Sequence, residues 1–206
     1  MTPSFNKVFS VFRKTYTLVP LEVFKKDPYK TLVSTLLSSR TKDETTLAAS
    51  IRLFKKAPNI NKLGQIGQSE IRNLIYPVGF YKTKAKHLKI LAEKISYEFG
   101  GKIPQTRDKL IKLPGVGRKT ANLVLNRAFG IPAIAVDTHV HRISNMIGWV
   151  KTKTPEQTER KLTKILPKKY WSEINRLFVS IGRQFTTKKR LNEFFIKEGL
   201  LKSPLR

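Results

Sequence analysis

Apolar residues recur at helical spacing along almost the whole chain. In MTPSFNKVFSVFRK they fall at Phe5, Val8, Phe9 and Phe12, which lie on one face of a helix. Strand-like alternation is absent except in residues 133–136, a segment too short to pair convincingly. The pattern therefore predicts an all-α protein.

Caps, prolines and glycines mark where these helices begin and end. Thr154-Pro155-Glu156-Gln157 combines an N-cap, a proline at the first helical position and a capping-box glutamine. Asp43 and Ser69 are expected N-caps, and Gly100-Gly101 closes the longest amphipathic segment. Together with the periodicity, these signals predict helices over residues 29–39, 43–54, 69–75, 82–99, 106–112, 118–129, 137–147, 170–184 and 188–198.

Charge points to a polyanionic partner. The 206 residues include 41 Lys and Arg but only 14 Asp and Glu, giving a net charge of +27. No low-complexity tail carries this excess, so nucleic acid is a better partner than an acidic membrane surface or an acidic protein. Such binding is expected to weaken as salt increases, because it releases counterions from phosphate.

Other compositional features exclude several classes of protein. The chain has no cysteine, which excludes disulfides, thiolate zinc sites, cysteine nucleophiles and cysteine-ligated iron–sulfur clusters. No apolar run is long enough to span a membrane, and the N-terminus lacks the pattern of a signal peptide. We expect a soluble protein that is not secreted and works in the cytoplasm, at the nucleoid, or in the nucleus.

The segment LPGVGRK, residues 113–119, predicts a phosphate-binding hairpin between two helices. Gly115, Val116 and Gly117 form a tight turn in which glycine permits positive φ and close approach. The amide groups and dipole at the start of the following helix attract a phosphate. A purely structural turn is the alternative, but the basic residues around it favour phosphate binding.

Two residues near this hairpin suggest chemistry on a sugar. Lys119 falls in the first turn of a helix, where the dipole disfavours a second positive charge and a neutral amine can act as a nucleophile. Asp137 is expected at the start of another helix, where its carboxylate could accept a proton or face developing positive charge. The ordinary alternatives are a solvated lysine and a simple N-cap.

The segment LPGVGRKTANLVLNRAFGIPAIAVDTHVHRI resembles the helix-hairpin-helix and Gly/Pro-rich-loop-Asp signature of the DNA glycosylase superfamily. More narrowly, it is similar to the endonuclease III family of glycosylases and AP lyases that act on damaged pyrimidines. Weaker similarity extends from about Tyr29 through VGFYKTKA, residues 78–85, to Ile181-Gly182-Arg183. The resemblance therefore spans most of the chain.

This resemblance implies roles for particular residues. Lys119 falls on the Schiff-base lysine, Asp137 on the catalytic aspartate and His139 on the histidine after it. The hairpin of residues 115–117 binds phosphate, and its carbonyls often hold a monovalent cation in this superfamily. Arg40 falls where a residue, often glutamine, enters the gap left by an extruded nucleotide, and Phe80 where an apolar wedge enters the base stack. The candidate DNA contacts are Arg40, Phe80, Lys84, Gly115, Val116, Gly117, Arg118, Thr120 and His139.

Ordinary alternatives remain for the two insertion residues. Arg40 could be a generic phosphate contact, and Phe80 could be a core aromatic residue. Arg40 in place of glutamine also leaves the preference for the opposite base open.

The same resemblance implies a two-lobed helical fold. One lobe would cover residues 20–131, and the other would join residues 1–19 to 132–206. The cleft between them would hold a flipped nucleotide, with Lys119 and Asp137 at its edges. The expected substrate is double-stranded DNA containing a damaged base or an abasic site, and the protein is expected to act as a monomer.

Endonuclease III usually ends in a cysteine-ligated iron–sulfur cluster, which this chain cannot hold. A helix over residues 188–200, packing Leu191, Phe194, Phe195 and Leu200, is expected in its place. Its basic residues, Lys188, Lys189 and Arg190, either contact DNA or form a solvated face. His87, His139 and His141 do not make a metal site, and we expect neither a metal nor a redox cofactor.

Two alternative functions remain open at this point. The chain could be a glycosylase of the same superfamily for mismatched uracil or thymine, or for 8-oxoguanine. In a different class, it could be a helix-hairpin-helix module that binds DNA without catalysis, although such a module needs neither Lys119 nor Asp137.

Overall fold

The computed structural model describes residues 2–202. These residues contain no β-strand, which confirms the predicted all-α fold. The chain divides into two compact units, one of residues 20–131 and another that joins residues 1–19 to 132–206. The first unit is therefore continuous in sequence, whereas the second is assembled from both ends of the chain.

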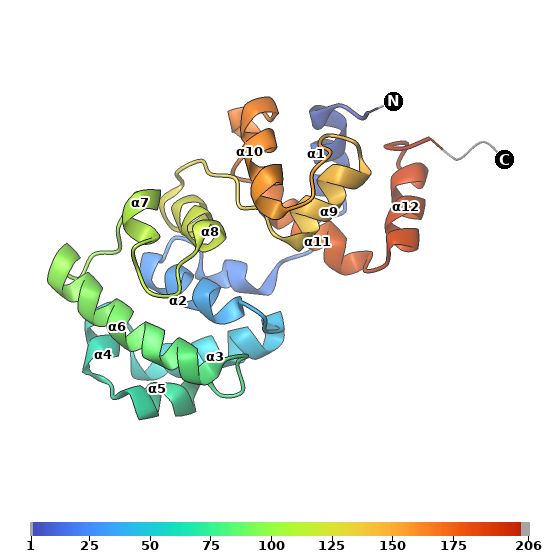
Figure 1. Cartoon of the computed structure of the whole chain (residues 1–206). Coiled ribbons are helices and arrows are strands. Elements are labelled where there is room, and N and C mark those ends of the chain that lie inside the picture. The colour runs from blue at the N-terminus through green and yellow to red at the C-terminus, as the bar shows by residue number, and fades with distance from the viewer. Residues whose placement is uncertain (1, 203–206) are drawn as a thin grey trace. The chain divides into compact units, whose positions relative to one another are not determined.

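The continuous unit surrounds one almost fully buried helix. Its elements are η1 (Pro20–Phe24), α2 (Pro28–Ser38), α3 (Asp43–Lys56), α4 (Ile60–Gln65), α5 (Gln68–Ile75), α6 (Tyr81–Phe99), α7 (Arg107–Leu110) and α8 (Arg118–Phe129) (Figure 1). The buried helix is α2, which packs against α3, α6 and α8. Asp27 caps it by accepting a hydrogen bond from Lys30 N at 2.9 Å. Burial on several sides explains why the buried residues of α2 lie all around the helix, small hydroxyl residues included, rather than along one stripe.

The second unit has an aromatic core. Its elements are α1 (Phe5–Lys14), α9 (Thr138–Met146), α10 (Pro155–Ile165), η2 (Lys168–Tyr170), α11 (Ile174–Gln184) and α12 (Lys188–Lys197). Phe9 stacks on Tyr170 with ring centroids 4.1 Å apart, and Phe12 meets Phe178 edge-on at 5.0 Å. These contacts dock α1 onto the C-terminal part of the chain.

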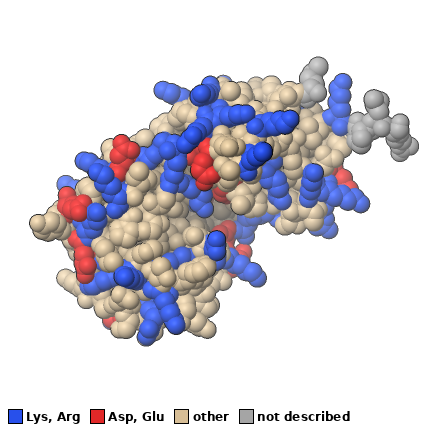
Figure 2. Space-filling model, viewed as in Figure 1, with Lys and Arg blue, Asp and Glu red and all other residues tan. Residues whose placement is uncertain are grey.

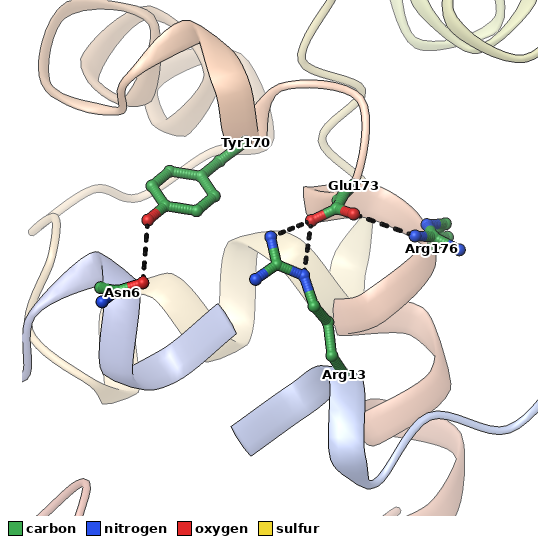
Figure 3. A network of polar contacts seen from close by, with 5 residues as sticks. All are labelled: Asn6, Arg13, Tyr170, Glu173 and Arg176. Carbon is green, nitrogen blue, oxygen red and sulfur yellow. Dashed lines mark hydrogen bonds and ion pairs between the residues drawn. The ribbon is translucent and has the colours of Figure 1, made fainter. Parts of the chain in front are cut away.

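A polar network lies beside this aromatic contact (Figure 3). Arg13 donates from Nε and a terminal nitrogen to Glu173 Oε2 at 3.0 and 2.5 Å, and Arg176 donates to Glu173 Oε1 at 3.1 Å. The Arg13 and Glu173 side chains are 44% and 23% exposed. Such a solvated ion pair contributes at most about 1 kcal/mol, whereas each buried aromatic side chain contributes about 1.5–3 kcal/mol. Aromatic packing therefore holds α1 in place.

The helix expected near the C-terminal end is present as α12. Thr187 caps it by accepting a hydrogen bond from Arg190 N at 3.2 Å. The Phe185 ring stacks on Phe194 with centroids 4.3 Å apart. The residues expected to pack are all buried: Leu191, Phe194, Phe195 and Leu200.

Some expected helix ends were wrong. Asp43 is the first residue of α3 rather than its cap, and Gly67 rather than Ser69 caps α5. The single helix expected over 170–184 is divided, because η2 and a turn precede the start of α11 at Ile174. Between residues 2 and 202, no helix is both long and apolar enough to cross a bilayer.

Candidate active site

The predicted hairpin joins α7 to α8 and is anchored by two buried apolar side chains, Leu113 and Val116. Val116 N donates to Leu113 O at 3.1 Å, which tightens the turn. Gly115 has φ +74°, and a Cβ there would lie 2.8 Å from His87 Nδ1 and 3.2 Å from Leu36 Cδ1. Backbone conformation and the neighbouring helices therefore both require glycine at this position.

Gly117 differs from Gly115 in both respects. It has φ −88° and ψ 176°, which any residue can adopt, and a Cβ added there would meet nothing within 4 Å. The expectation of positive φ is therefore correct for Gly115 and wrong for Gly117. Gly117 leaves open space at the start of α8, where a group from outside the protein can approach the backbone.

The start of α8 presents Lys119 to solvent. The first hydrogen bond of the helix runs from Ala121 N to Gly117 O at 2.9 Å, so the amide groups of the first turn point out of the helix end. Arg118 and Lys119 are exposed, while Thr120 is 9% exposed and lies at the edge of the core. Within residues 2–202, Lys119 makes no ion pair or hydrogen bond. Its amine is accessible to a ligand.

Asp137 is the N-cap of α9, which is the structural role that the sequence also allowed for it. Its Oδ1 accepts hydrogen bonds from His139 N at 3.0 Å and Val140 N at 2.9 Å. The residue is half-buried. Both backbone amide groups donate to the same oxygen, Oδ1, and these two hydrogen bonds fix the orientation of the carboxylate. Oδ2 takes no part in them.

His139 packs against α11 within the same unit. A Cβ added at Gly182 would lie 2.1 Å from His139 Nδ1, so this contact requires a glycine. Burial lowers the pKa of the His139 imidazole. The negative charge of Asp137 raises this pKa, and the positive charge of Arg142 lowers it further. A neutral imidazole is favoured at this position. His141 makes a separate contact, with its Nδ1 2.6 Å from Thr158 Oγ1.

No metal site emerges from the described part of the chain. Residues 2–202 contain no group of three or more His, Cys, Asp or Glu side chains that could hold an ion. The His141 ring is held by a hydrogen bond with Thr158, whereas the His139 ring packs against Gly182 of α11.

Arg40 and Phe80 lie together on the surface of the continuous unit. The Arg40 guanidinium carbon is 5.5 Å from the centre of the Phe80 ring. Both residues have positive φ, at 51° and 57°. Phe80 is 61% exposed, so the alternative of a core aromatic residue is wrong. An exposed phenyl ring on a left-handed backbone is unusual, and such strained positions cluster at functional sites.

A cavity of about 320 Å³ opens beside this pair. It reaches the hairpin through Gly115 and thus joins three segments that are distant in sequence. Its lining residues are Leu36, Ser39, Arg40, Phe80, Thr83, Lys84, His87 and Gly115.

Lys84 requires a different interpretation from the one that the sequence suggested. It is only 6% exposed, and its Nζ donates to Leu37 O at 2.7 Å, Ser39 O at 2.5 Å and Thr41 Oγ1 at 3.3 Å. Burial lowers the pKa of Lys84 to about 8. Because its three donors are used inside the protein, Lys84 supports the turn after α2 and does not present a free ammonium group to DNA.

Sequence reasoning missed two residues around the cavity. His87 was considered only as a metal ligand, yet it lines the cavity and contacts the hairpin at Gly115. Gly79 packs against the backbone of Arg40, where a Cβ would lie 2.4 Å from its carbonyl oxygen. Neither contact leaves a signal in the local sequence, because the partner comes from a distant segment in each case.

Basic side chains are spread over the surface. Figure 2 shows Lys and Arg distributed over the whole displayed face, with only a few acidic side chains among them. This distribution agrees with the net charge of +27. It suits a partner, such as a nucleic acid, whose negative charges are spread over a long surface.

Residues 33–168 match the family model described as HhH-GPD superfamily base excision DNA repair protein. The chain belongs to this superfamily. It is 47% identical over 158 residues to endonuclease III of Thermotoga maritima, covering 77% of this chain and 74% of that protein. Endonuclease III-like protein 1 of Gallus gallus is 43% identical over 171 residues, or 82% of this chain and 60% of that protein. The chain thus spans about three fifths of the length of the chicken relative.

Solved structures agree with this membership in the HhH-GPD superfamily. A trapped covalent intermediate of endonuclease III with DNA, an estranged-adenine complex, has a TM-score of 0.80 and 32% identity, covering 89% of this chain and 85% of that chain. A non-covalent endonuclease III–DNA complex has a TM-score of 0.79 and 31% identity, covering 89% and 88%. The predicted fold and family are therefore confirmed, and the comparisons support the role of DNA glycosylase and AP lyase.

The chain departs from the endonuclease III pattern after Gly182-Arg183. It has no cysteine to ligate an iron–sulfur cluster, so the residues present do not fit that group. Instead, Gln184 Nε2 donates to Thr15 O at 2.9 Å and Ser180 O at 3.3 Å, and α12 follows at once. Hydrogen bonds and apolar packing thus order this part of the HhH-GPD fold.

Proposed function

We propose that this protein is a base-excision-repair DNA glycosylase with AP lyase activity that removes oxidised or otherwise damaged pyrimidines. The observation that carries the proposal is Lys119, an exposed amine in the first turn of α8 directly after the Gly115–Gly117 hairpin. Membership in a base excision repair superfamily supports it. A DNA-binding module has no need of a nucleophile at this position.

Lys119 begins the proposed reaction. Its amine gives a proton to Asp137 and attacks C1′ of the damaged nucleotide, while the bond from C1′ to the base breaks and the departing base takes up the proton that Asp137 received. The sugar ring then opens to a protonated imine on Lys119. Loss of a C2′ proton and cleavage of the C3′–O bond cut the strand on the 3′ side of the lesion.

The DNA-binding groups lie around one cavity of the continuous unit. The hairpin and the start of α8 bind a phosphate through backbone amides and the helix dipole. Arg40 and Phe80 enter the duplex and offset the stacking lost when the damaged nucleotide swings out. The exposure of Phe80 and its contact with Arg40 support this role. The protein acts as a monomer on double-stranded DNA, in the cytoplasm or nucleus.

Borohydride trapping tests the proposal. Duplexes carrying an abasic site, thymine glycol, uracil opposite guanine or 8-oxoguanine would be incubated with wild type, Lys119→Gln and Lys112→Gln, the last being an exposed lysine of the same hairpin. Wild type and Lys112→Gln should form a covalent adduct, strongest with the abasic site and thymine glycol, and Lys119→Gln should form none. Salt-sensitive binding without any adduct would instead indicate a DNA-binding module, and a preference for uracil or 8-oxoguanine would change the substrate class.

A further inference from the structure

Two exposed residues with left-handed backbones, Arg40 and Phe80, meet although 39 residues of chain separate them. Arg40 lies just after the end of α2, and Phe80 is the residue before α6. A left-handed conformation is unfavourable for residues with side chains of this size, so neighbouring residues must stabilise both backbones. The contacts of Gly79, Thr41 and Lys84 identify these neighbours.

The two backbone segments touch directly at Gly79. A Cβ at Gly79 would lie 2.4 Å from Arg40 O and 3.3 Å from Thr41 Oγ1. Gly79 N also donates a hydrogen bond to Thr41 Oγ1 at 3.1 Å. The turn before α6 is therefore seated on the turn after α2, and this seating places the Phe80 ring beside the Arg40 guanidinium.

Lys84 joins the same two turns from inside the protein. It lies in the first turns of α6, and its ammonium group reaches Leu37 O, Ser39 O and Thr41 Oγ1 at 2.7, 2.5 and 3.3 Å. Leu37 O is among the last carbonyls of α2, where a positive charge is favourable. Thr41 Oγ1 thus accepts from both Gly79 and Lys84, so the ammonium group completes one connected network.

We propose that Lys84 is a positioning residue for duplex insertion, which fixes Arg40 and Phe80 in the paired arrangement that enters the DNA. This inference rests on the insertion role given to that pair in the proposed function. The hydrogen bonds of the Lys84 ammonium group go to the end of α2 and the turn after it, not to the hairpin of residues 115–117. Its effect passes through the two turns that it joins.

The chemistry of the side chain accounts for a lysine at this position. Three acceptors converge on one point, which suits the compact ammonium group better than the planar fork of an arginine. Methionine has a similar length and would fill the same space, but it would leave the acceptors without their donor. Lys84→Met therefore tests the hydrogen bonds without opening a cavity.

Fluorescence of 2-aminopurine gives a readout of insertion that does not depend on catalysis. The base would be placed opposite a tetrahydrofuran abasic analogue in a duplex, and its signal measured at saturating protein. Wild type should change the fluorescence, whereas Lys84→Met should give about a tenfold smaller population of the inserted state, because positioning errors of about 1 Å have effects of this order or larger. Affinity for the duplex should change much less than the fluorescence.

Lys89→Met is the matched control. Lys89 is also on α6 and also holds a backbone carbonyl, donating to Gly64 O at 2.5 Å, but its hydrogen bond and its ion pair go to Gly64 and Glu93 rather than to either turn. Its variant should insert like wild type. Gly79→Ala provides a second route to the same defect, because the added Cβ pushes the two turns apart while Lys84 stays intact.

The outcomes separate this inference from the proposed chemistry. Normal fluorescence changes with both Lys84→Met and Gly79→Ala, or no change with wild type itself, would overturn the positioning role. So would an equal loss of trapping by Lys84→Met on a paired lesion and on a single-stranded abasic site, since only the paired lesion needs insertion. Absence of a covalent adduct with intact fluorescence changes would count against the Lys119 chemistry alone.

Discussion

The starts of α8 and α6 each carry a lysine, but the two lysines have opposite surroundings. Lys119 is exposed and makes no ion pair or hydrogen bond within residues 2–202. Lys84 is 6% exposed and donates three hydrogen bonds. An accessible amine can react with a ligand, whereas a buried and fully bonded one holds a structure together.

This comparison shows what net charge does not reveal. Both lysines belong to the same basic excess and both fall in segments that resemble endonuclease III. Only their contacts separate a candidate nucleophile from a structural support. A count of positive charges predicts DNA binding for the chain as a whole, and it assigns no role to an individual residue.

The largest effect is expected from a change at Asp137, the proposed proton acceptor for the exposed Lys119. Asp137→Asn should slow the single-turnover lyase rate by about 100-fold or more, because it removes the proton acceptor. Asparagine is also a good N-cap, so the thermal stability of the protein should stay close to that of wild type. An unchanged rate would reduce Asp137 to a cap and leave Lys119 without the carboxylate that the reaction requires.

A second test contrasts the two glycines of the hairpin. Gly115→Ala should lower the free energy of unfolding by about 1–3 kcal/mol, because it combines positive φ with a contact 2.8 Å from His87 Nδ1. Gly117→Ala should lower it by no more than about 1 kcal/mol, the scale of an N-cap substitution, yet weaken binding to duplex DNA, since its Cβ would occupy the space open to a phosphate.

Chemical denaturation and a binding titration at fixed salt would measure these two effects. Equal destabilisation by both substitutions would show that the hairpin needs two structural glycines. Unaltered DNA affinity in Gly117→Ala would place the phosphate elsewhere.

A smaller effect is expected from the titration of Lys84. Burial lowers its pKa from the ordinary 10.5 to about 8, so between these values the unfolded chain binds more protons than the folded one. Wild-type stability should therefore rise relative to Lys84→Met as pH increases from about 8 to about 10. Urea denaturation of both proteins across this range would measure the difference. A difference that is flat or falls with pH would contradict the burial of a charged amine.

Much of the fold could be predicted from the sequence, because it follows from local signals. Periodicity and end signals placed the α8 helix at Arg118–Phe129, and the αL cap at Gly100 ends α6 as expected. α4 was missed although Asn59 caps it, accepting a hydrogen bond from Lys62 N at 2.9 Å. Six residues are too few for periodicity to stand out.

The candidate site could be predicted only in part. The phosphate hairpin, Lys119 and Asp137 lie in one continuous motif, and the sequence therefore identified them as candidates. The burial of Lys84 and the contact of His87 with Gly115 depend on packing between α2, α6 and the hairpin. A linear pattern does not contain such contacts, which is why Lys84 was placed among the direct DNA contacts.

Peptide mapping of the borohydride-trapped adduct tests the central claim most directly. The wild-type protein would be trapped on an abasic duplex, digested after removal of most of the DNA, and analysed by mass spectrometry for the lysine that carries the reduced sugar. The account predicts modification at Lys119 and none at Lys84. Modification of Lys84 or of another lysine, with Lys119 unmodified, would contradict it.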